Sequence, residues 1–164
     1  MSERMVSNEE LIGYLDRLPI FKVNWKTFDR ILYPEDAVQW GMNEKMVEVK
    51  KGGIVYTERA NPCLAGACIV GQNFYLFHSM GLVLPEGIIK AKRGLVGGSK
   101  EQLNEYKTTL KQLGFIIMEP PSSDHAFNVA VIRRKNFFSL DSRFIPQGIY
   151  CCYTSLFYEE EGYF

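Results

Sequence analysis

Apolar residues in the first quarter of the chain recur at helical spacing. One set follows Ser7 and Glu10, which are spaced as a capping box, and it stops before Pro19. A second set starts at Trp25, and Pro34 and residue 41 suit the start and end of a further short helix. The members of the two sets are Leu11, Tyr14, Leu15 and Leu18, and Trp25, Phe28, Ile31 and Leu32. The pattern predicts a helical N-terminal cap over residues 1–42.

After residue 43 the pattern changes to short apolar runs separated by turn residues, which is typical of strands. Residues 46–49 and 54–57 are expected to form a hairpin around the Lys-Lys-Gly-Gly turn at 50–53. Residues 64–70 and 74–80 are expected to form a second hairpin around Gly-Gln-Asn at 71–73.

A longer amphipathic helix is predicted over residues 99–113. Ser99 and Gln102 form its capping box, and Gly114 is its C-cap. Strands are expected at 115–118 and 127–131, with 137–140 pairing back on the latter. The predicted fold class is α+β, with a mostly antiparallel sheet, one main packed helix and the helical N-terminal cap.

The length of 164 residues suits a single domain, 1–164. It divides into the cap at 1–42, an α+β core at 43–145 and an aromatic C-terminal tail at 146–164. The upstream part of that tail is expected to pack on the sheet. We find no internal repeat and no low-complexity segment.

The charge balance and the composition limit the classes of binding partner that we expect. Nineteen Lys and Arg balance nineteen Asp and Glu, so no bulk field attracts nucleic acid or anionic lipid. Residues 1–10 lack a secretory pattern, and no apolar run is long enough to cross a membrane. A soluble, cytoplasmic protein with four reduced cysteines is expected.

The pairing register of the second hairpin determines whether a cysteine and a histidine lie on the same face of the sheet. A thiol needs a neighbouring base to become a nucleophile, and the chain has two histidines, His78 and His125. A three-residue loop at 71–73 places Cys68 diagonally across from His78, and a slip of two residues places them face to face. A slip of one residue puts them on opposite faces. Cys63 has the wrong parity in both favourable registers. Without further information, a buried small thiol and a structural imidazole are the simpler interpretation.

Several short segments, in the same order, resemble CheD, the chemoreceptor glutamine deamidase family. The run 64–70 is similar to the family's Gly-Ser-Cys strand start, with Ala67 in place of the serine. His78-Ser79-Met80 resembles its His-x-Met, and residues 95–99, with Gly97 and Gly98, resemble its apolar-Gly-Gly-small segment. Residues 101–118 are similar to its helix, Leu-Gly turn and strand. The resemblance covers roughly residues 54–140.

The resemblance implies a cysteine-dependent amidohydrolase that deamidates glutamine in a protein and needs no cofactor or metal. Cys68 is then the nucleophile and His78 the base, with oxyanion or substrate-loop groups near Ala67, Gly97 and Gly98. The family's threonine, six residues before the cysteine, falls on Pro62. Asn61 or a backbone carbonyl is left for this third role.

Departures from the family leave other functions open. The segment between Cys68 and His78 is shorter than in the chemotaxis enzymes, and residues 80–97 lack the expected helix. One alternative is a non-catalytic protein-interaction domain of the same fold that has lost the third catalytic group. Another is a toxin-like or effector-like deamidase, of the cytotoxic necrotizing factor type, that acts on a host protein. The partner in the enzymatic interpretations is a protein with an exposed glutamine.

Other combinations of reactive residues have simpler explanations. Ser123, Asp124 and His125 are adjacent in a Pro-rich loop, and four cysteines do not have the spacing of zinc ligands. The basic clusters at 90–93 and 133–135 are too short for nucleic acid and are expected to be solvated strand ends.

Overall fold

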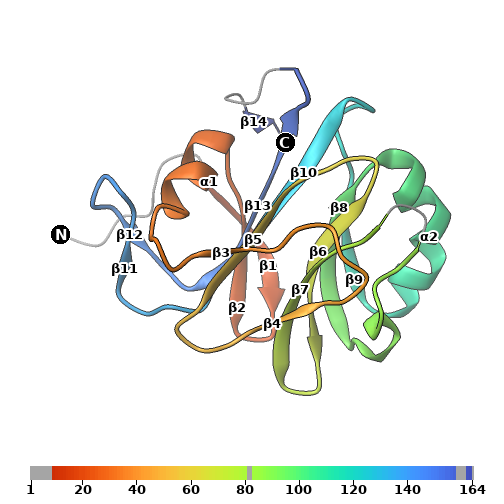
Figure 1. Cartoon of the computed structure of the whole chain (residues 1–164), viewed down its shortest axis with the longest axis horizontal. Coiled ribbons are helices and arrows are strands. Elements are labelled where there is room, and N and C mark those ends of the chain that lie inside the picture. Colours follow the sequence, from red (N-terminus) through yellow and green to blue (C-terminus); the bar gives the residue numbers. More distant parts are fainter. Residues whose placement is uncertain (1–8, 81–82, 158–161, 164) are drawn as a thin grey trace.

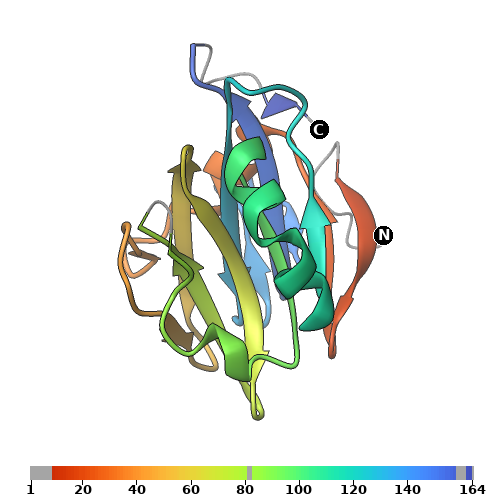
Figure 2. The ribbon, with the colours of Figure 1, turned by 90° about the vertical axis from the view of Figure 1, so that its right-hand side faces the viewer.

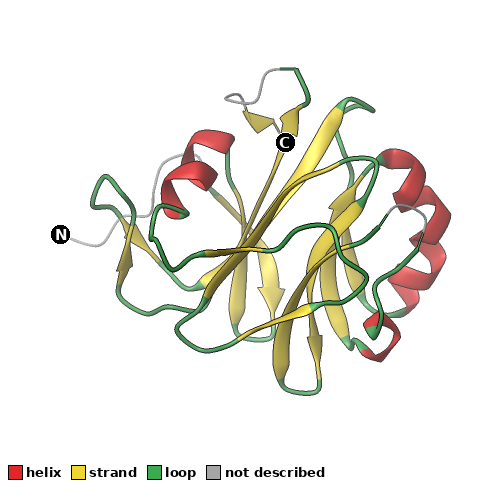
Figure 3. Ribbon diagram, viewed as in Figure 1, coloured by secondary structure: helices red, strands yellow, loops and turns green. Residues whose placement is uncertain are grey.

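A computed structural model describes residues 9–80, 83–157 and 162–163 and shows two facing β-sheets (Figures 1 and 3). It is mostly β, with 46% strand and 16% helix. The described strands are β1 (Glu10–Leu15), β2 (Leu18–Lys22), β3 (Val38–Gln39), β4 (Val47–Val49), β5 (Ile54–Ala60), β6 (Leu64–Val70), β7 (Asn73–His78), β8 (Arg93–Gly98), β9 (Phe115–Met118), β10 (His125–Ile132), β11 (Phe137–Phe138), β12 (Phe144–Ile145), β13 (Gly148–Ser155) and β14 (Gly162–Tyr163). The helices are α1 (Trp25–Ile31), the short 3₁₀ helix η1 (Ile88–Lys90) and α2 (Lys100–Gln112).

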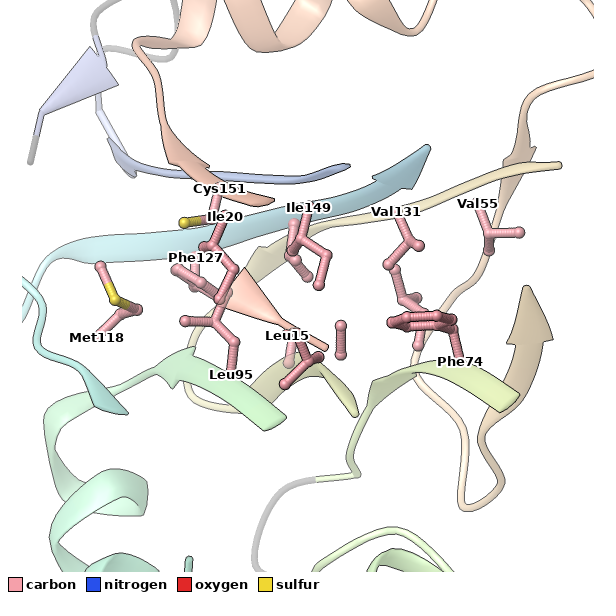
Figure 4. Packing of buried hydrophobic residues seen from close by; sticks show 14 of the residues in the cluster. Leu15, Ile20, Val55, Phe74, Leu95, Met118, Phe127, Val131, Ile149 and Cys151 are labelled. Carbon is pink, nitrogen blue, oxygen red and sulfur yellow. The ribbon is translucent and has the colours of Figure 1, made fainter. Parts of the chain in front are cut away.

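The first sheet has the strand order β1-β2-β13-β10-β5-β3, with β14 beside β13. The second has the order β4-β7-β6-β8-β9. Apolar side chains from both sheets meet between them, among them Val131 and Ile149 from the first sheet and Phe74 and Leu95 from the second (Figure 4). This interior is the main core of the molecule.

Helical and short-strand segments cover the two outer faces. Helix α2 packs on the second sheet through a cluster that includes Leu103, Leu110 and Phe77 (Figure 2). Helix α1 and the β11–β12 ribbon cover the first sheet through Phe28, Ile31 and Phe137. Because both faces of the first sheet are covered, β10 and β13 are apolar along most of their length rather than alternating.

The α+β class with a helical N-terminal cap is wrong, because the N-terminal region is mainly β. Residues 10–22 form the antiparallel β1–β2 hairpin, and β2 then pairs in parallel with β13. That long-range pairing overrides the helical spacing of the apolar residues. Ser7 of the expected capping box lies outside the described residues, and residues 34–41 contain β3 rather than a helix. Within the cap, only α1 agrees with the expected pattern.

Two further pairings differ from expectation. β4 and β5 do not form a hairpin: β4 pairs with β7 in the second sheet, and β5 pairs with β10 in the first. Their connecting turn therefore passes from one sheet to the other. β11 pairs with β12 rather than with β10, and the upstream part of the expected tail is the central strand β13.

The β6–β7 hairpin and α2 are confirmed. Ser99 is the N-cap of α2, and its side chain accepts a hydrogen bond from the backbone N–H of Gln102. The β6–β7 hairpin contains Cys68 and His78, the two residues expected to form the catalytic pair, and α2 packs against the same sheet.

Candidate functional site

The turn between β6 and β7 fixes which residues face each other. Val70 pairs with Asn73, so the turn has two residues, Gly71 and Gln72, and Gly71 has a positive φ of 65°. Cys68 consequently pairs with Tyr75, and Ala65 pairs with His78. This register differs by one residue from the one expected, and it places Cys68 and His78 on opposite faces of the sheet.

Cys68 faces α2 rather than the interior between the sheets. It belongs to the buried cluster that contains Leu64, Phe77 and Leu103, and its sulfur lies 3.5 Å from the Met46 sulfur. Burial raises the pKa of the Cys68 thiol to about 12. A thiol with this pKa is protonated at neutral pH, so Cys68 has the properties of a packing residue.

His78 faces the other sheet and contacts a threonine there. Its Nδ1 atom lies 2.7 Å from the Oγ1 atom of Thr57 on β5, and both side chains are buried. Burial lowers the pKa of His78, which favours the neutral imidazole. When Nδ1 carries the proton, the ring donates to Thr57 and Nε2 is left as the basic atom.

Cys63 lies on the same face as His78. It comes two residues before Ala65, the partner of His78, and it belongs to the hydrophobic cluster between the sheets. Diagonal neighbours of this kind have Cα atoms roughly 7–8 Å apart. The observed register therefore excludes a Cys68–His78 pair and brings Cys63 towards the imidazole.

Hydrogen bonds hold the backbone around Cys63 in place. The carbonyl oxygen of Cys63 accepts from the N–H of Ser99 at 3.1 Å. Leu64 donates its N–H to the Ser79 hydroxyl at 3.2 Å, and Ser79 donates its N–H to the Leu64 carbonyl at 2.8 Å. The start of β6 and the end of β7 are thus joined beside Cys63 and His78.

Met42 covers the thiol of Cys63. Their sulfur atoms are 3.3 Å apart, and Cys63 is 6% exposed whereas Met42 is 54% exposed. Met42 lies in the connection between β3 and β4, and the next residue, Asn43, donates its N–H to the His78 carbonyl at 2.9 Å. The exposed side chain of Met42 therefore helps to shield this thiol from solvent.

Thr57 precedes Cys63 by six residues. This is the spacing of the threonine in the CheD family, which falls on Pro62 when Cys68 is taken as the nucleophile. Thr57 lies on β5 of the first sheet, His78 lies at the end of β7 in the second sheet, and Cys63 directly precedes β6, the neighbour of β7. The spacing between Thr57 and Cys63 can be read from the sequence, but the resemblance places Cys68 at the nucleophile position and therefore does not draw on it.

Asn61 has a different role from the one expected. Its side-chain amide donates to the carbonyl oxygens of Ser123 at 3.0 Å and His125 at 2.7 Å. The Asn61 side chain therefore connects the loop before Cys63 to the backbone at the start of β10. Thr57 is the residue that contacts the His78 ring.

The expected oxyanion groups lie apart from one another. Ala67 is in the middle of β6, paired with Leu76 on one side and Leu95 on the other, so its backbone is part of the sheet. Gly97 and Gly98 end β8. A Cβ atom at Gly98 would lie 2.2 Å from the Cys63 carbonyl oxygen, and one at Gly97 would lie 2.5 Å from the Phe127 ring. Gly98 thus permits the close approach of β8 to the backbone of Cys63.

The remaining candidates do not form a second site. Ser122 donates to Asp124 and contacts Nδ1 of His125 at 2.8 Å, within an exposed loop. Cys151 and Cys152 are fully buried on β13, and burial raises the pKa of both thiols. In the part of the chain that the structure describes, no three His, Cys, Asp or Glu residues are grouped as metal ligands. No described helix has the length and apolar character needed to cross a membrane.

Comparison with protein-family models, with curated proteins and with solved structures gives no match.

Proposed function

We propose that the chain is a thiol amidohydrolase that deamidates glutamine in a protein, with Cys63 as its nucleophile. His78 is the base, and Thr57 is the positioning residue that orients the imidazole. The observation that carries the proposal is the 2.7 Å contact between Thr57 Oγ1 and His78 Nδ1, on the sheet face that Cys63 shares.

The reaction requires a thiolate, because a carboxamide is a poor electrophile. His78 Nε2 takes the proton from the Cys63 thiol, and the sulfur attacks the amide carbon of glutamine. The protonated imidazole then gives its proton to the departing nitrogen, and ammonia leaves as the C–N bond breaks. Water attacks the resulting thioester with His78 again as base, which releases glutamate and restores the thiol.

The burial of the pair supports this assignment. The lowered pKa of His78 keeps Nε2 unprotonated at neutral pH, as a base requires. Thr57 lies on β5 of the first sheet and His78 on β7 of the second, so the two facing sheets hold the contact. A rotamer fixed by such packing limits the reorganisation needed before proton transfer.

The surroundings of Cys63 favour a side chain presented by a protein. Met42 and Met80 are both about half exposed, and Met80 follows His78 by two residues. The apolar side chain of Met42 beside the thiol suits the methylene groups of a glutamine, while the glutamine amide reaches the sulfur. Movement of Met42 is required for this, since Met42 covers Cys63.

Ammonia release tests the proposal. An unfolded, glutamine-rich protein is incubated with the wild-type chain, and ammonia is measured together with conversion of glutamine to glutamate by peptide mass spectrometry. We expect Cys63→Ser to abolish both signals and Cys68→Ser, the matched control, to retain them. Loss of activity in Cys68→Ser but not in Cys63→Ser would reject Cys63 as the nucleophile. Absence of both signals in the wild-type chain would favour the non-catalytic interaction domain.

A further inference from the structure

A hollow of about 1150 Å³ opens at the end of the sandwich remote from Cys63. Phe74, near the start of β7, lies in its wall, four residues before His78. Four residues of extended strand span about 13 Å, so this hollow is separate from the site around Cys63. Leu18, Pro19 and Pro146 add further apolar surface.

Four cationic side chains from three connections line the hollow. Arg17 comes from the β1–β2 turn, Lys51 from the β4–β5 turn, and Arg133 and Lys135 from the segment after β10. The acidic residue of the lining, Asp16, has its carboxylate 3.9 Å from Arg93. In a chain with equal numbers of acidic and basic residues, this is a local concentration of positive charge.

Three cations of the hollow have no carboxylate partner among the described residues. Within residues 9–80 and 83–157, no ion pair joins Arg17, Lys51 or Lys135 to an acidic side chain. Arg134 shows the contrast, because it binds both oxygens of Asp36 at 3.1 and 2.6 Å.

Arg133 lies in the wall of the hollow. Its guanidinium lies 4.8 Å from the centre of the Phe74 ring, and its Nη1 donates to the Val49 carbonyl at 3.1 Å. Its Nε is buried and has no hydrogen-bond partner among the described residues. Because Nε is shielded from solvent, Arg133 contributes to the hollow through the positive charge of its guanidinium, which attracts an anionic ligand.

We propose that this hollow binds a small molecule that carries a phosphate group on an apolar or aromatic body. Arginine and lysine donors recognise the phosphate oxygens. The volume exceeds that of a phosphate alone, and the apolar wall of Leu18, Pro19, Phe74 and Pro146 accommodates the body. The proposal gives Arg133 and Lys135 a role in addition to that of the solvated strand ends expected from the sequence.

Calorimetric titration with phenyl phosphate, inorganic phosphate and phenol tests the proposal at constant ionic strength, with sodium chloride as the ionic control. Phenyl phosphate is expected to bind more tightly than inorganic phosphate, and phenol and chloride are expected to give no saturable binding. The double variant Lys51→Gln/Lys135→Gln should weaken phenyl phosphate binding by about tenfold or more.

The matched control is Lys26→Gln/Lys111→Gln, which removes the same charge from residues on α1 and α2 outside the hollow. It is expected to retain wild-type affinity. Absence of saturable phenyl phosphate binding to the wild-type chain, or equal weakening in the two double variants, would overturn the proposal. The titration is repeated on Cys63→Ser, which should bind equally, so the result does not depend on the proposed deamidase activity.

Discussion

Ala65 on β6 is paired directly with His78 on β7, and this one register position determines which cysteine faces the imidazole. Side chains alternate between the two faces of a strand, so Cys63 shares the face of Ala65 while Cys68 takes the opposite face. The same hairpin with a three-residue turn would reverse the two assignments. The chemistry proposed for this chain therefore depends on a turn at the far end of the hairpin.

Cys63 is expected to be the most reactive of the four thiols. The other three are fully buried, and burial raises the pKa of each of them, whereas Cys63 is 6% exposed and its sulfur contacts the exposed side chain of Met42. In the folded protein at pH 7, iodoacetamide should label Cys63 at least about tenfold faster than Cys68. Peptide mass spectrometry over a time course measures the four rates. Similar rates at all four positions would contradict the prediction.

Removing the Met42 side chain should increase the labelling rate of Cys63. Met42 is half exposed and contacts the Cys63 sulfur, so Met42→Ala opens the thiol to reagents at a small cost in stability, about 1 kcal/mol or less. Met46→Ala is the matched control, because Met46 makes the equivalent contact with Cys68. It should leave the rate at Cys63 unchanged. An unchanged rate in Met42→Ala would show that Met42 does not limit access.

The hydroxyl of Thr57 should matter for both stability and thiol reactivity. Thr57→Val keeps the shape of the side chain but leaves His78 Nδ1 without its partner, which costs roughly 1–3 kcal/mol of unfolding free energy. Labelling of Cys63 should also slow, because the imidazole loses its fixed orientation. Urea unfolding and iodoacetamide labelling measure the two effects.

Thr57→Ser separates a positioning role from simple packing. Serine keeps the hydroxyl and removes a methyl group, so it should lose some stability yet retain most of the labelling rate at Cys63. A labelling rate in Thr57→Ser as low as that in Thr57→Val would indicate that the methyl contact, rather than the hydrogen bond, matters.

The elements of the β6–β7 hairpin were predictable from sequence, but their register was not. Two apolar runs flank Gly71, and either a two-residue or a three-residue turn fits Gly-Gln-Asn. Only the packing of both faces distinguishes the two, with Cys68 against α2 and His78 against β5. Local sequence carries no information about those distant partners.

The prediction of a helix in the N-terminal segment failed for a related reason. Leu15 and Leu18 satisfy a helical pattern, and their strand conformation follows from the pairing of β2 with β13, more than 120 residues later. Helix α2 has both caps and its apolar face within one segment, so its sequence was sufficient. For the candidate site, the sequence named His78 as a candidate base, but its contact with Thr57 depends on how β5 packs against β7 and could not be predicted from local sequence.

The lowered pKa of His78 predicts how stability depends on pH. An unfolded histidine has a pKa near 6.5, and burial lowers the value in the folded protein, so the unfolded chain binds a proton more readily. The contribution of neutral His78 is present above pH 6.5 and is lost as the pH falls through the folded pKa. Urea unfolding at pH 7.5, 6.5 and 5.5 should show a smaller decrease in His78→Gln than in wild type. An identical decrease in the two proteins would contradict the prediction, and His125→Gln controls for the other histidine.

Gly98 should tolerate no side chain, because β8 passes directly over the backbone of Cys63. A Cβ atom there would lie 2.2 Å from the Cys63 carbonyl oxygen and 2.9 Å from the Leu64 Cα, and the φ of 145° is one that other residues rarely adopt. Gly98→Ala should therefore cost roughly 1–3 kcal/mol of unfolding free energy and displace the start of β6. Gly41→Ala is the matched control, since a Cβ atom at Gly41 meets nothing within 4 Å. Equal unfolding free energies for the two variants, measured in urea, would mean that the approach of β8 to Cys63 is looser than the structure indicates.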